Sequence, residues 1–77
     1  MIAIRFHSEL YDGFAIDEAV KVYAPFASAE LSREPAAYIV RLSALPEAIE
    51  QGFDEEAISA ALANYALGKT IERGGAG

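Results

Sequence analysis

The stretch that decides the fold runs from Asp54 to Glu72 and reads DEEAISAALANYALGKTIE. It is the longest helical pattern in the chain, because its apolar positions recur at spacings of three and four residues. The positions that form one side of the predicted helix are Ile58, Ala61, Leu62, Tyr65 and Lys69. A helix cannot bury such a side alone, so the rest of the chain must supply a surface for it.

Both ends of this helix carry residues that favour helix termini. Asp54 is suited to cap the first turn, and Glu55 and Glu56 match the positive end of the helix dipole. Gly74 provides a stop at the other end. Within the helix, Gly68 is expected to divide a packed first half from a freer second half.

The other side of the helix indicates a second role. Asn64, Leu67 and Ile71 lie away from the central apolar row, and we expect them to face a partner. For Asn64 two interpretations stay open, a solvated side chain or a buried amide that needs a hydrogen-bonding partner.

The N-terminus predicts a strand over residues 2–7. Its side chains alternate with a period of two, as in a strand with one buried face. The buried face consists of Ile2, Ile4 and Phe6, and the outer face of Ala3, Arg5 and His7.

An amphipathic helix is predicted next, over residues 14–24. Residues 8–13 connect it to the strand, with Asp12-Gly13 as a turn signal. Pro25 ends the helix, because the residue before a proline resists helical dihedral angles.

A hairpin follows, with strands over residues 26–31 and 36–42 joined by the connection 32–35. Matching the apolar faces sets the expected register. On the buried face it pairs Leu31 with Tyr38, Ala29 with Val40 and Ala27 with Leu42. On the other face it pairs Glu30 with Ile39 and Ser28 with Arg41.

These elements predict an α+β fold with the order β-α-β-β-α. Residues 1–73 form one two-layer domain, a three-stranded sheet with both helices on one face and the third strand in the middle. It resembles a ferredoxin-like fold lacking its last strand. Residues 43–53 are expected to be a loop with one helical turn from Pro46 to Ile49, and residues 74–77 a flexible tail.

Composition narrows the classes of function. Twelve acidic and six basic side chains give a net charge of −6, which disfavours nucleic acid and anionic membranes as partners. No apolar run approaches the ~20 residues that span a bilayer. The chain has no cysteine and its N-terminus does not read as a signal peptide, so we expect a cytoplasmic protein.

Candidates for chemistry are sparse. His7 is the only histidine, and the sequence offers it neither an orienting partner nor a set of metal ligands. The acidic clusters Asp17-Glu18 and Asp54-Glu55-Glu56 are explained by the places expected for them in first helical turns. We therefore expect no catalytic residue, metal or cofactor.

Association is the more promising line, because a 77-residue core without disulfides is marginal. The predicted order leaves the first strand at an edge, where a second copy or a partner peptide can add a strand. Tyr11, in the loop that follows, is the tyrosine expected at an interface, whereas Tyr23, Tyr38 and Tyr65 are assigned to the core. The predicted partner-binding residues are Arg5, His7, Tyr11, Asn64, Leu67 and Ile71.

The chain resembles the HxsD family, the small component of His-Xaa-Ser peptide maturation systems, over nearly its whole length. The resemblance lies in the strand ending at Phe6, in Tyr11 and Ile16 to Ala19, in the YIVRL strand, and in Asn64-Tyr65-Ala66-Leu67 with Ile71. Gly68 and the ending GKTIER depart from the more charged final helix of that family. The resemblance implies a partner of radical SAM enzymes that modify a repeat peptide, and it implies no cofactor or catalytic residue here.

Three functions follow as hypotheses. The first is a non-catalytic binding or assembly module for a protein or peptide partner. The second is a small-ligand-binding homodimer or minimal enzyme that uses His7 at a subunit interface. The third is a purely structural homodimer.

Overall fold

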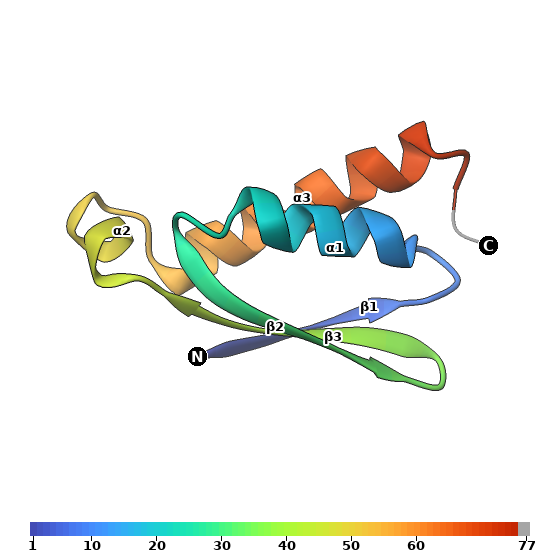
Figure 1. Cartoon of the computed structure of the whole chain (residues 1–77), viewed down its shortest axis with the longest axis horizontal. Coiled ribbons are helices and arrows are strands. Elements are labelled where there is room, and N and C mark those ends of the chain that lie inside the picture. Colours follow the sequence, from blue (N-terminus) through green and yellow to red (C-terminus); the bar gives the residue numbers. More distant parts are fainter. Residues whose placement is uncertain (76–77) are drawn as a thin grey trace.

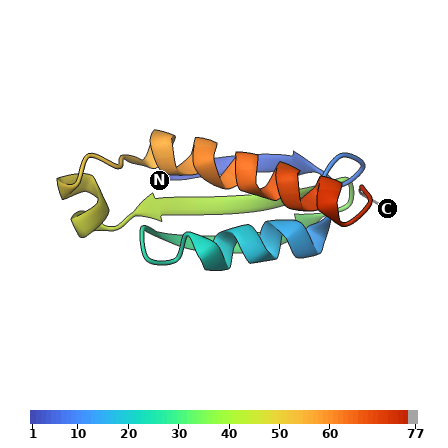
Figure 2. The same cartoon turned by 90° about the horizontal axis from the view of Figure 1, so that it is seen from above.

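The computed structural model describes residues 1–75 as a three-stranded antiparallel sheet with two long helices on one face (Figure 1). The elements are β1 (Ile2–His7), α1 (Gly13–Val22), β2 (Ala27–Glu34), β3 (Ala37–Ala44), α2 (Pro46–Glu50) and α3 (Glu55–Glu72). The strand order is β1-β3-β2, so β3 is central, and the predicted two-layer α+β fold is confirmed. Seen from above, α3 runs along the β1 side of the sheet and α1 along the β2 side (Figure 2).

Helix α1 is shorter at its C-terminus than the sequence pattern predicts. The Asp12 carboxylate caps its start by accepting a hydrogen bond from Ala15 N–H at 3.1 Å. At the other end, the amides of Phe26 and Ala27 both donate to the Tyr23 carbonyl. This turn ends the helix before Pro25 is reached.

The predicted hairpin exists, but its predicted register is wrong by two residues. Leu31 lies opposite Val40 and Ala29 opposite Leu42, because β2 continues to Glu34. The connection is therefore the two-residue loop 35–36 and not the four residues 32–35. A shift of two residues keeps every side chain on its predicted face.

The ends of α3 are as predicted. Asp54 accepts from Ala57 N–H at 2.8 Å, and the helix stops at a glycine with positive φ. Gly74 N–H donates to the Ile71 carbonyl and Gly75 N–H to the Thr70 carbonyl, which is the bonding pattern of a Schellman motif. The expected tail spans residues 74–77, and residues 76–77 lie outside the described part of the chain.

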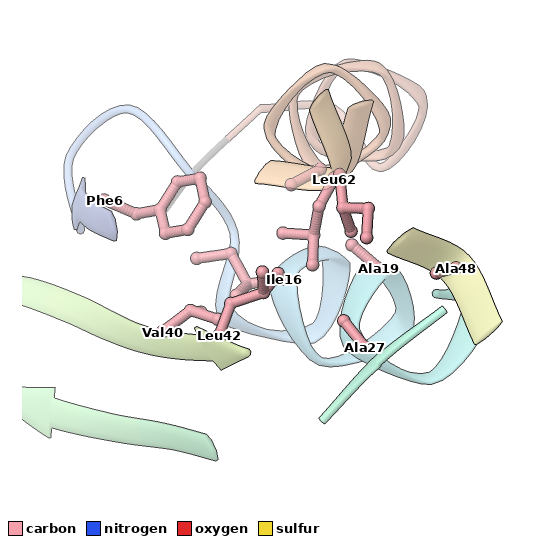
Figure 3. Packing of buried hydrophobic residues seen from close by; sticks show 10 residues of the cluster. Phe6, Ile16, Ala19, Ala27, Val40, Leu42, Ala48 and Leu62 are labelled. Carbon is pink, nitrogen blue, oxygen red and sulfur yellow. The ribbon is translucent and has the colours of Figure 1, made fainter. Parts of the chain in front are cut away.

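The core lies between the helices and the sheet, where side chains from β1, α1, β3 and α3 converge (Figure 3). Its fully buried large residues are Phe6, Ile16, Val40, Leu42 and Leu62. In α3, Ile58 and Leu62 are buried as predicted, but the buried row continues through Ala66 and Thr70 and not through Tyr65 and Lys69. Tyr65 and Lys69 are half-buried beside α1, where both contact the Glu18 carboxylate.

The C-terminal half of α3 is packed, so the expected division at Gly68 is wrong. Thr70 is only 2% exposed, and its hydroxyl accepts a hydrogen bond from Asp12 N–H at 3.0 Å. The same hydroxyl donates to the Ala66 carbonyl at 2.8 Å. Arg73 then pairs with the Asp12 carboxylate at 2.7 Å, so the end of α3 is fastened to the connection between β1 and α1.

Candidate interaction surface

The hydrogen-bonding pattern between β1 and β3 determines which backbone groups of β1 are free at the edge of the sheet. Ser8 N–H donates to the Ala36 carbonyl at 3.1 Å, which continues the β1–β3 ladder by one pair. Residues of an antiparallel strand bond to the neighbouring strand at every second position. The backbone groups of Ile2, Ile4 and Phe6 are therefore directed at β3.

The intervening residues direct their backbone groups away from the sheet. Ala3 and Arg5 each present an N–H and a C=O at the open edge, and His7 presents its N–H. The His7 carbonyl is already used, because it accepts from the amides of Leu10 and Tyr11 at 3.0 Å. The edge thus offers two complete residues, Ala3 and Arg5, to an added strand.

The Arg5 side chain is turned away from this edge. Its guanidinium pairs with the Glu34 carboxylate of β2, which lies on the other side of β3. Both side chains are about half exposed, so the pair is worth at most about 1 kcal/mol. Its structural effect is more important, because it holds the one charge of β1 over the outer face of the sheet.

His7 lies at the end of β1 on the outer face, opposite Ala37 and exposed, as the alternation predicts. Within residues 1–75, no group of three or more histidine or acidic side chains is placed to hold a metal ion. The structure therefore brings His7 and Arg5 to one face of one strand and adds no acidic partner to His7.

The α3 helix above the edge carries the other predicted contact residues. Asn64, Leu67 and Ile71 are exposed; Leu67 retains 42% of its accessible surface and Ile71 68%. The Asn64 amide is solvated, which settles the choice that the sequence left open. Ser59 and Ala63 are half-buried on the same margin, away from the side that contacts α1.

Tyr11 packs into the fold more than a loop residue was expected to. Its ring meets Phe6 edge to face, with the centroids 4.8 Å apart, and it is half-buried against the core. The residue that the loop exposes is its neighbour Leu10, at 63%. Sequence reasoning missed Leu10, and periodicity offered no signal for a single apolar residue in a turn.

Two hollows lie on other parts of the surface. The larger, about 390 Å³, is lined by Asp12, Gly13, Phe14, Asp17, Leu31, Arg33 and Tyr38. Its two carboxylates already have partners, since Asp12 pairs with Arg73 and Asp17 with Lys21, and the Arg33 guanidinium lies over the Tyr38 ring. The smaller, about 260 Å³, is apolar and is lined by Tyr23, Phe26, Phe53, Ala57, Ile58 and Ala61.

The perturbed ionisations belong to structural contacts. The terminal amine of Met1 pairs with Glu55 at 2.8 Å and lowers the pKa of that carboxyl, with help from Ala44 N–H. The pKa of Tyr65 is raised by burial and by its hydrogen bond to Glu18. These groups join helix to strand and helix to helix, and they do not converge on a hollow.

Comparison with known proteins adds no relative. Neither the models of known families nor the curated proteins nor the solved structures contain a match to this chain. No helix within residues 1–75 is long and apolar enough to cross a bilayer.

Proposed function

We propose that this domain is a non-catalytic binding and assembly module. Its association surface is the open edge of β1 together with the exposed margin of α3. The observation that carries the proposal is the edge itself, where Ala3 and Arg5 offer unpaired backbone donors and acceptors in a strand free of proline and bulges.

The arrangement of the remaining side chains supports binding in preference to catalysis. His7 is exposed and lacks an acidic neighbour within its strand, and the two carboxylates at the larger hollow are already paired with Arg73 and Lys21. Orientation by a second group is what a histidine base requires. A surface that offers backbone bonds and apolar side chains is suited to hold a protein segment.

The resemblance to the HxsD family supplies the class of partner. On this basis the partners are radical SAM enzymes and the His-Xaa-Ser peptide that they modify. The chemistry then belongs to those enzymes, and this domain holds or positions one of them. The residues assigned to the surface are Arg5, His7, Tyr11, Asn64, Leu67 and Ile71.

Co-purification tests the proposal. The tagged domain is expected to retain a radical SAM enzyme or a His-Xaa-Ser repeat peptide, and Ile71→Glu is expected to weaken that retention. Val22→Glu is the matched control, because Val22 is an exposed apolar residue of α1 and lies outside the assigned set. Absence of binding to either partner at tens of micromolar would overturn the maturation role.

A further inference from the structure

We infer that the strand taken up by the β1 edge is β1 of a second copy of this chain, paired antiparallel about Ile4. The inference rests on the proposed function in one respect, because it uses the same edge as the association surface. It goes beyond that function by naming the occupant and the register.

The edge selects an uncharged strand. Arg5 is the only charged side chain within Ile2–His7, and Glu34 already neutralises it over the outer face. An edge without net charge offers nothing to distinguish an acidic or basic peptide. A strand of its own composition fits it without an unpaired charge.

Symmetry restricts the register. Residues that lie directly opposite each other in the joined sheet point their side chains to the same face. The helices of both copies therefore share one face only if even-numbered residues lie opposite even-numbered ones, which places the two-fold axis through a residue. An axis through Arg5 pairs Ala3 with His7, whose carbonyl is already occupied by the amides of Leu10 and Tyr11. An axis through Ala3 shortens the overlap of the strands. An axis through Ile4 avoids both penalties.

The Ile4 register also fits the free backbone groups. It places Ala3 of one copy opposite Arg5 of the other, and these are the two residues whose N–H and C=O both point outward. Each such pair exchanges two hydrogen bonds, so the two pairs make four. On the helix side, Ile4 meets Ile4 and Ile2 meets Phe6, an apolar match.

The relative direction of the helices is compatible with the same arrangement. Helix α3 runs in the direction of β1, since Met1 contacts Glu55 at one end and Asp12 contacts Arg73 at the other. The two α3 helices of the pair are therefore antiparallel. The N-terminal end of each α3 dipole then lies beside the C-terminal end of the other, which is the favourable alignment, while Lys69 and Arg73 stay paired with Glu18 and Asp12 of their own chain.

The side chains between these helices are small. Ser59 and Ala63 lie on the α3 margin that faces away from α1, with Leu67 one turn further on. Small residues at such a crossing let two helices approach closely. Leu67 is then covered by the second copy, while the solvent side of α3 with Asn64 stays open to another partner.

Cysteine cross-linking tests the register directly. The chain has no cysteine, so a single substitution gives an unambiguous product. In the Ile4 register two residues at position 4 form a non-hydrogen-bonded pair with Cα atoms about 4.5 Å apart, within the range of a disulfide. Ile4→Cys is expected to form a covalent dimer rapidly under mild oxidation.

Ile2→Cys is the matched control, because it lies on the same face of the same strand and faces Phe6 in this register. Two such residues are four positions out of step, beyond disulfide reach at about 3.4 Å per residue. The inference is overturned by equal cross-linking of both variants, by faster cross-linking of Ile2→Cys, or by a wild-type chain that sediments as a monomer.

Two proline variants give an independent measurement. Ala3→Pro removes an outward N–H and is expected to halve the mass in solution, because it leaves the bonds to β3 intact. Ala29→Pro removes an outward N–H at the opposite edge and is expected to leave the dimer intact. A dimer that survives Ala3→Pro contradicts the inference. These experiments use the purified chain alone, so loss of partner binding with an intact dimer counts against the proposed function only.

Discussion

The two edges of the sheet have the same backbone alternation and opposite surfaces. Leu45 N–H donates to the Phe26 carbonyl at 2.9 Å, so Ala29, Leu31 and Arg33 of β2 point their backbone groups outward, as Ala3 and Arg5 do on β1. Strand β2, however, carries Glu30, Arg33 and Glu34, whereas β1 has only Arg5.

Charge on an edge strand discourages further pairing. On β2 this protection is built in, because Glu30 and Arg33 lie along the edge that faces solvent. On β1 the only charged side chain, Arg5, pairs with Glu34 across β3, so no charge lies along the edge itself. By this comparison, only the β2 edge of the sheet is protected against strand addition. The open edge is β1, which lies beneath α3.

The largest expected effect comes from placing a charge on each edge in turn. Ile4 and Leu31 are both half-buried and both lie opposite the buried Val40, one on each side of it. Ile4→Lys is expected to abolish association, because it adds an inward-pointing charge to the open edge.

Leu31→Lys is the control for the loss of buried apolar surface. Both substitutions are expected to lower the free energy of unfolding by about 1–3 kcal/mol, softened by the long lysine stem. Sedimentation measures the mass of each variant and chemical denaturation its stability. Equal loss of association in both variants would contradict the distinction between the edges.

A smaller effect is expected where the open side is fastened to α3. Thr70→Val keeps the shape of the side chain but leaves Asp12 N–H without its acceptor, at a cost of about 1–3 kcal/mol. Ser59→Ala, which removes a more exposed hydroxyl bonded to the Glu56 carbonyl, is expected to cost much less. Thermal denaturation of the two variants compares them. Equal melting temperatures would show that the end of α3 does not hold this side.

A still smaller effect tests why the β1 edge is uncharged. Glu34→Gln releases the Arg5 guanidinium, which is then free to swing toward the edge. Association is expected to weaken at low ionic strength and to recover in salt, because screening shortens the reach of the charge. Stability should change by at most about 1 kcal/mol. Stronger association in this variant would refute the role given to the ion pair.

The smallest effect lies between the helices, away from both edges. Burial, and then the hydrogen bond to Glu18, raises the pKa of Tyr65. A raised pKa means that folding favours the neutral phenol, so this stabilisation is present below the ordinary value of about 10 and is lost as pH rises through the folded value. Ultraviolet titration of the wild type against Tyr65→Phe measures the last tyrosine to ionise. A Tyr65 that ionises at or below the ordinary value would contradict the contact.

Much of the fold was predictable because local chemistry determines it. Asp54 and Gly74 carry the side chain and the backbone freedom that helix ends need, and both act as predicted. The alternation of Ile2, Ile4 and Phe6 placed β1 with its apolar face toward the helices. The central position of β3 was also predicted from the apolar faces of the strands.

The rest depended on contacts between distant residues. Matching apolar faces fixes which side a residue takes but not its offset, so the sequence could not distinguish Leu31 opposite Tyr38 from Leu31 opposite Val40. The bond from Asp12 to Thr70 joins residues 58 positions apart, and no periodicity predicts it. The burial of Thr70 was missed for that reason.

The exposure of most residues assigned to the candidate surface was predictable, but their contacts were not. Arg5, His7, Leu67 and Ile71 were assigned to it from their faces, and all four are exposed. The packing of Tyr11 on Phe6 and the retreat of Arg5 to Glu34 depend on three-dimensional neighbours. The sequence did not reveal which residues of β1 form hydrogen bonds with β3. This alternation decides which backbone groups are free at the edge.

The central claim is that Ala3 and Arg5 are the free backbone groups through which the chain associates. Amide hydrogen exchange, measured residue by residue over a range of protein concentrations, tests it most directly. We predict that protection at Ala3 and Arg5 rises with concentration while that of Ala29 and Leu31 stays unchanged. Protection that rises at Ala29 and Leu31 instead, or at neither edge, would contradict the account.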